Sequence, residues 1–148
     1  DNVRDRIFID GLKEYASKIR SFNWSYYNTK SFHCSEMIIR RYNQGSEFKY
    51  HHDDIIGEMF QHWFIRRQNI LTCNFYFSDA KDYEGGDLVF TCSDKKYHTS
   101  VGDIIIFPSN WMFYHEVQKI TKGKRYSGTV WLYYGSGRKM PNAKSKDW

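Results

Sequence analysis

The amino-acid sequence predicts a mainly β fold, an antiparallel sandwich or barrel preceded by one or two short helices. Short runs of β-branched and aromatic residues, separated by turn signals, recur between residues 37 and 134. Before them, residues 3–20 carry apolar side chains at roughly helical spacing. The length of 148 residues and the hydrophobic content of 41% suit one core, so we expect a single domain over residues 1–148.

The expected elements follow one another along the chain. Gly11 allows a break between two short N-terminal helices. Residues 54–68 place aromatic side chains between charged ones and form either a lid over a site or a helix packed on the sheet. The predicted strands are residues 37–42, 47–51, 69–77, 87–90, 103–107 and 125–134, and the predicted turns are residues 43–45, 78–86, 100–103, 107–110 and 121–124.

The composition limits which binding partners and which cellular compartment are expected. The net charge of +5 permits an acidic partner or nucleic acid, but the basic residues are spread along the chain. Cys34, Cys73 and Cys92 make an odd number and form no CxxC motif, which favours a reducing, cytoplasmic setting. Since no apolar run approaches the roughly 18 residues of a membrane span, we expect no membrane partner.

The segment YHHDD, residues 50–54, is the first candidate for chemistry. Alternate side chains of a strand share a face, so His51 with Asp53, or His52 with Asp54, can reach one metal ion. A His-x-Asp pair is a weak signal by itself and needs a third ligand from a distant strand. The spacing leaves both frames open.

His115, just after the predicted strand 103–107, is the candidate for the third ligand. Two histidines and one carboxylate form the facial triad of non-haem Fe(II) oxygenases, which leaves positions open on the metal. His33, His62 and His98 have no carboxylate at this spacing and are interpreted as ordinary surface or core residues.

Arg125 and Ser127, in the segment RYSGTVW, share one face of a predicted strand. An arginine fork pairs with both oxygens of a carboxylate, and a neighbouring hydroxyl adds a further hydrogen bond. The pair therefore suits the far carboxylate of a small diacid that is chelated to the metal.

Four segments, taken in order, carry a resemblance to a known family. They are RYNQGSEFKYHHD (41–53), FYFSDAKDYEGGDLVF (75–90), VGDIIIFPSNWMFYHEV (101–117) and TKGKRYSGTVW (121–131). In these segments the chain resembles the iron(II)- and 2-oxoglutarate-dependent oxygenases, specifically the prolyl 4-hydroxylase-like branch of compact microbial or viral type.

The resemblance implies a double-stranded β-helix, or jelly roll, with iron between its two sheets. It favours the first frame, because family segments read aromatic-x-aromatic-His-x-Asp, as residues 48–53 do here. In animal oxygen-sensing prolyl hydroxylases a tyrosine on the third core strand contacts 2-oxoglutarate; the best-aligned residue here is Phe75, with Tyr76 on the opposite face. The implied iron ligands are His51, Asp53 and His115, the implied 2-oxoglutarate contacts are Arg125, Ser127 and Tyr42, and the implied pocket residues are Tyr50 and Trp131, with core packing as the alternative for Tyr42 and Trp131.

The function that the resemblance implies is a dioxygenase that hydroxylates a C–H bond, with peptidyl proline as the expected target and succinate and CO2 as products. Its cofactors would be Fe(II), 2-oxoglutarate and O2, with ascorbate as an optional addition. The partner would be a proline-containing peptide or protein, and a monomer is the default. The alternatives are the same chemistry on a free amino acid or another protein side chain, a non-catalytic jelly-roll binding module, and an AlkB-like nucleic-acid demethylase, which carries a second arginine where this chain has Trp131.

Overall fold

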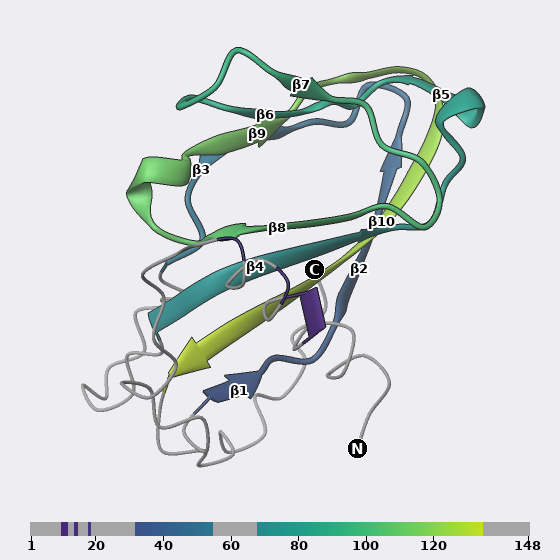
Figure 1. The fold of residues 1–148 in the computed structure, drawn as a ribbon. Helices are drawn as coiled ribbons and strands as arrows, with labels where there is room; N and C mark the ends of the chain where they lie inside the picture. Colours follow the sequence, from purple (N-terminus) through teal and green to yellow (C-terminus); the bar gives the residue numbers. More distant parts are fainter. Residues whose placement is uncertain (1–9, 12–13, 15–17, 19–31, 55–67, 135–148) are drawn as a thin grey trace, which may run out of the picture.

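The computed structural model describes residues 10–11, 14, 18, 32–54 and 68–134. Strands within residues 32–54 and 68–134 form two antiparallel sheets that face each other (Figure 1). This arrangement confirms the mainly β prediction and is consistent with a double-stranded β-helix. Within these residues no helix is long and apolar enough to cross a membrane. The predicted N-terminal helices and the 54–68 segment lie almost entirely outside the described residues.

The larger sheet is built around one long strand. β10 (Ile120–Tyr134) pairs with β1 (Phe32–Cys34), β2 (Ile38–Asn43), β4 (Gln68–Tyr76) and β5 (Tyr83–Gly85). β8 (Ile104–Pro108) extends the sheet by pairing with β4. Since β2 and β4 flank the same stretch of β10, three neighbouring strands present one continuous inner face.

The smaller sheet has the order β3-β9-β6-β7 and lies across from the larger one (Figure 1). Two 3-10 turns, η3 and η4, precede β5 and β9 along the chain. The bounds are Phe48–His51 for β3, His115–Val117 for β9, Leu88–Phe90 for β6, Lys96–Tyr97 for β7, Ala80–Asp82 for η3 and Trp111–Phe113 for η4.

Five of the six predicted strands begin and end within one residue of the predicted positions. The sixth, predicted as residues 125–134, is longer and begins at Ile120. Residues 121–124 were predicted as a turn, and this is wrong because β10 runs through them. The register shifts between Ile120 and Lys122, and Gly123 adopts a φ of +77°. A Cβ at Gly123 would lie 2.1 Å from the carbonyl oxygen of Asp82, so the glycine marks a close approach of η3 and not a chain reversal.

The alternation of β10 separates two environments. Val130 and Leu132 pack on one face with Cys73 and Phe75 of β4. On the other face, Arg125, Ser127, Thr129 and Trp131 line a cavity between the sheets. A second apolar cluster borders this cavity, and some of its members line it. Its buried members are Tyr42, Tyr83, Leu88, Phe90, Phe107, Val117 and Ile120.

Candidate metal centre and its cavity

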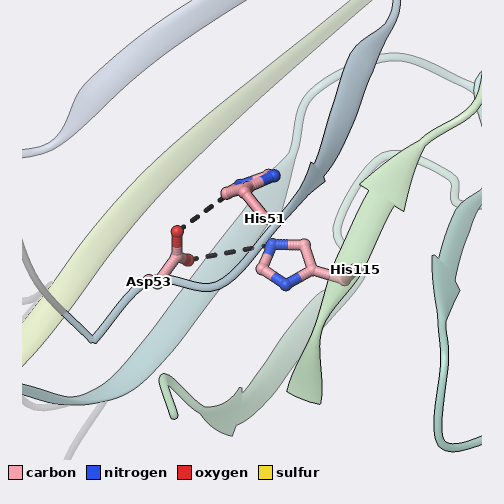
Figure 2. Close-up of side chains that lie close together, drawn as sticks. All are labelled: His51, Asp53 and His115. Carbon is pink, nitrogen blue, oxygen red and sulfur yellow. Dashed lines mark ion pairs between the residues drawn. The ribbon is translucent and has the colours of Figure 1, made fainter. Parts of the chain in front are cut away.

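The side chains of His51, Asp53 and His115 lie close together, as Figure 2 shows, and all three line the cavity. His51 ends β3 and lies opposite His115, the first residue of β9, while Asp53 follows β3. One nitrogen or oxygen from each residue lies within 4.8 Å of the others. The separations are 3.5 Å from His51 Nε2 to Asp53 Oδ1 and 3.8 Å from His115 Nε2 to Asp53 Oδ2.

Both histidines are oriented by the backbone. His51 Nδ1 donates to the carbonyl of Lys49 at 2.7 Å, and His115 Nδ1 donates to the carbonyl of Phe113 at 2.9 Å. These bonds fix the proton on Nδ1 and leave a lone pair on each Nε2, the atom that faces Asp53. Burial lowers the pKa of His115, against the opposing effects of the Phe113 carbonyl and the Asp53 charge, and so favours the neutral, ligating form.

A bulge in β3 decides which of its side chains enter the cavity. Phe48 pairs with Val117 and His51 with His115, so three residue steps of β3 face two steps of β9. Phe48 and His51 therefore both line the cavity. Tyr50, predicted as a pocket residue, is instead 42% exposed and stacks on Tyr114 with 6.2 Å between ring centroids. Ordinary alternation already turns Tyr50 away from the face of His51, and the bulge instead brings Phe48 onto that face.

Asp53 is held by residues of β4 and of the segment after β8. The hydroxyl of Thr72 donates to Asp53 Oδ2 at 2.8 Å, and Nδ2 of Asn69 donates to the Asp53 carbonyl at 2.8 Å. The Asp53 amide donates to the carbonyl of Ser109, whose hydroxyl is 2.9 Å from that of Thr72. Residues of the larger sheet thus position the carboxylate of Asp53, which follows β3 of the smaller sheet.

The other frame forms a separate pair. His52 Nδ1 lies 2.8 Å from Asp54 Oδ1, although the orientation does not meet hydrogen-bond geometry. Neither residue lines the cavity, and the His52 ring lies 5.7 Å from that of Tyr114. His52 and Asp54 are therefore turned away from the triad.

Arg125 occupies another part of the cavity and is 1% exposed. Its Nη1 donates to the carbonyl of Gly86 at 2.6 Å, and its guanidinium carbon lies 4.6 Å from the ring centroid of Tyr42. The buried Nε has no hydrogen-bond partner in the described part of the chain. A buried, incompletely paired guanidinium is costly, so this end of the cavity suits an anion.

The structure brings most of the predicted residues into one cavity and adds several that the sequence did not indicate. Tyr42, Ser127 and Trp131 line it beside the triad and Arg125. Tyr76, and not Phe75, faces this cavity, with its ring centroid 5.5 Å from the Arg125 guanidinium. The unpredicted polar lining residues are Arg40, Asn74, Tyr76 and Thr129. These residues alternate along β2, β4 and β10. Once the pairing of these strands is known, the alternation shows that the residues share the face of the sheet that lines the cavity.

The 2OG-Fe(II) oxygenase superfamily matches residues 37–133, a range that includes the triad and Arg125. The chain belongs to the 2OG-Fe(II) oxygenase superfamily. This family implies Fe(II) and 2-oxoglutarate as metal and co-substrate.

Bacterial proteins named PKHD-type hydroxylases are similar to this chain. One from Stutzerimonas stutzeri is 31% identical over 93 residues, 62% of this chain and 40% of that protein. One from Acinetobacter baylyi is 28% identical over 102 residues, 68% of this chain and 44% of that protein. The chain thus spans less than half the length of these relatives.

Solved structures share the fold at lower sequence identity. A viral collagen prolyl hydroxylase from Paramecium bursaria Chlorella virus 1, in its 2-oxoglutarate complex, has a TM-score of 0.57 at 17% identity, covering 83% of this chain and 74% of that one. A prolyl-4-hydroxylase from Pseudomonas putida has a TM-score of 0.52 at 20% identity, covering 70% and 53%. These likenesses support the two-sheet arrangement.

The residues of the oxygenase cavity fit both groups that the family implies. Two neutral imidazole nitrogens and one carboxylate are a suitable donor set for Fe(II), and they stand far enough apart to surround an ion. The buried Nε of Arg125 lacks a partner that a carboxylate oxygen would supply. The same cavity therefore offers ligand atoms for Fe(II) and a guanidinium for a carboxylate of 2-oxoglutarate.

Proposed function

We propose that this chain is an Fe(II)- and 2-oxoglutarate-dependent dioxygenase, folded over residues 1–148 as one jelly-roll domain, that hydroxylates a C–H bond of peptidyl proline and releases succinate and CO2. The observation that carries the proposal is the joint placement of the three potential ligands and the buried Arg125 on one cavity. A non-catalytic module has no need for an open metal face beside a receptor for a carboxylate.

In this proposal His51, Asp53 and His115 hold the iron, and Arg125 with Ser127 holds the far carboxylate of 2-oxoglutarate. Bound iron, with 2-oxoglutarate and O2, would supply the oxidising chemistry for hydroxylation of the substrate. The protein contributes fixed ligand orientation through the carbonyls of Lys49 and Phe113. The Gly86 carbonyl aligns Arg125 in the same way.

Other residues keep the cavity fit for this reaction. Leu88 and Val117 are buried members of its lining and exclude water from the co-substrate. Tyr42 packs its ring on the Arg125 guanidinium and holds the side chain against the sheet. Gly86 has a φ of +69°, and a Cβ there would meet Ile120 Cδ1 at 2.2 Å, so the carbonyl that anchors Arg125 depends on glycine.

Peptidyl proline is proposed as substrate from the resemblance of the four sequence segments to prolyl 4-hydroxylases. The test supplies Fe(II), 2-oxoglutarate and a panel of proline-containing peptides, and measures succinate together with the peptide mass. We expect succinate to form and one peptide class to gain one oxygen atom. Succinate without any oxidised peptide would move the proposal to free amino acids or other side chains.

Arg125→Ala tests the co-substrate site directly. Loss of a charge-assisted, bidentate contact should weaken 2-oxoglutarate binding about 10- to 100-fold. Lys124→Ala, the exposed neighbour on β10, is the matched control and should bind 2-oxoglutarate like the wild type. Equal affinity in all three proteins would remove Arg125 from the proposed site.

A further inference from the structure

Arg40 is a charged residue of the cavity for which the proposed reaction gives no role. It lies on β2 opposite Ser127 of β10 and lines the same cavity as His51. Within the described residues its guanidinium makes one hydrogen bond, from Nη1 to Thr129 Oγ1 at 3.1 Å. Since a guanidinium carries five N–H donors, most of them remain for a ligand.

The surroundings hold Arg40 in place. Its guanidinium carbon lies 5.7 Å from the ring centroid of Phe48 and 5.8 Å from that of Trp131. Thr129, which accepts from Arg40, donates in turn to Asn74 Oδ1 at 2.8 Å. Two aromatic rings and a hydrogen-bonded chain across β2, β10 and β4 thus preorganise this cation.

The charges of the cavity leave Arg40 without a counterion. Among residues 32–54 and 68–134, no ion pair joins Arg40 to a carboxylate. The charged lining side chains are Arg40, Arg125 and Asp53. A divalent metal and the dianion of 2-oxoglutarate offset each other, and Asp53 offsets one arginine. One positive charge remains for the substrate to meet.

Trp131 adds a second donor beside this charge. It is 6% exposed, and its Nε1 is buried without a hydrogen-bond partner among the described residues. A buried unpaired N–H is unfavourable, so a ligand in this part of the cavity gains by offering an acceptor. An acceptor that also meets Arg40 best carries a negative charge.

We propose that Arg40 and the Trp131 Nε1 group form a subsite for a carboxylate of the substrate. This inference rests on the proposed function and narrows its substrate class to anionic molecules. The carboxylate is either the C-terminal group of the hydroxylated residue or an acidic side chain beside it in a peptide. Both sources present the same chemistry to Arg40, and probes distinguish them.

The test measures binding to protein loaded with Zn(II) and 2-oxoglutarate, so that no turnover occurs. N-acetylproline and N-acetylprolinamide differ in the terminal carboxylate, and peptides containing Pro-Asp or Pro-Asn differ in the acidic side chain. We expect wild type to bind one acid at least about tenfold more tightly than its neutral counterpart. The pair that shows the preference identifies the source of the carboxylate.

Variants assign the preference to the subsite. Arg40→Gln should abolish the preference for the acid, Arg40→Lys should keep part of it, and Trp131→Phe, which retains an aromatic ring, should reduce it. Arg41→Gln is the matched control, because Arg41 is the exposed neighbour of Arg40 on β2 and does not line the cavity. It should retain the full preference.

Binding of 2-oxoglutarate, measured separately on the same proteins, distinguishes the two levels of the proposal. Its absence from wild type would reject the proposed function itself. Normal 2-oxoglutarate binding with equal affinity for acid and neutral probes, or with no binding of either acid, would reject the Arg40 subsite alone. Loss of 2-oxoglutarate binding in Arg40→Gln would make Arg40 a co-substrate contact and would also overturn the subsite.

Discussion

Inside the cavity and outside it, this molecule brings histidine and aspartate together in different geometries. Outside the cavity, Nδ1 of His52 and of His98 lies 2.8 Å and 2.7 Å from the carboxylates of Asp54 and Asp87. In the cavity, the Nε2 atoms of His51 and His115 stand 3.5 Å and 3.8 Å from Asp53. The outer pairs are in direct contact, whereas the inner group is more widely spaced.

The difference comes from what holds the imidazole rings. In the cavity each Nδ1 is bonded to a backbone carbonyl, and Thr72 draws the Asp53 carboxylate toward the larger sheet. In the His98 pair the carboxylate itself takes Nδ1. Neighbouring histidine and aspartate side chains therefore suit a metal ion only where other groups fix the rings and keep the potential ligands apart.

The largest expected effect is the loss of Fe(II) affinity when a histidine inside the cavity is removed. His115→Ala removes one of the three ligand groups and should weaken Fe(II) binding by more than the roughly 10- to 100-fold expected for an outer partner. Anaerobic titration with Fe(II) measures it. His98→Ala, on the outside, should bind Fe(II) like the wild type; similar losses in both variants would erase the distinction between inner and outer pairs.

A smaller effect should follow from loosening the carboxylate. Thr72→Val removes the hydroxyl that donates to Asp53 Oδ2 while keeping a β-branched side chain in β4. We expect Fe(II) affinity to fall about 10- to 100-fold. Thr91→Val serves as control, since the Thr91 hydroxyl is exposed and donates to the Tyr114 carbonyl. Unchanged affinity in Thr72→Val would mean that Asp53 needs no such support.

The smallest effect concerns the outer pair of His98. Its hydrogen bond to Asp87 raises the pKa of His98 from 6.5, against a smaller opposing effect of burial. A raised pKa in the folded state stabilises the protein fully below 6.5, and this contribution is lost as the pH rises through the raised value. His98→Gln should therefore reduce the free energy of unfolding by at most about 1 kcal/mol at about pH 5, and by less at about pH 8. Denaturant unfolding at both pH values measures it, and a larger loss at the higher pH would contradict the assignment.

The sequence predicted the residues that act through short, local patterns. The runs 37–42 and 103–107 correspond to β2 and β8, because each carries a stretch of β-formers bounded by turn residues. His51, Asp53, His115 and Arg125 were selected by spacing and by the family resemblance, and the structure brings them onto one cavity.

What the sequence could not predict depends on contacts between distant segments. Thr72 supports Asp53 from 19 residues away, and no local pattern marks that threonine. The bulge of β3 brought Phe48 into the cavity beside His51, because the register with β9 is set by tertiary pairing. The choice of Tyr76 over Phe75 likewise follows from which face of β4 packs with Val130 and Leu132. Arg40 entered the cavity through its pairing with β10.

The central claim is that His51 and Asp53, and not His52 and Asp54, belong to the metal site. The most direct measurement is the anaerobic Fe(II) dissociation constant of His51→Ala and His52→Ala beside the wild type. We predict that His51→Ala raises this constant by more than about 100-fold. His52→Ala, which alters a pair that does not line the cavity, should stay within about threefold of the wild type. The reverse pattern, with His52→Ala losing Fe(II) and His51→Ala keeping it, would contradict the account.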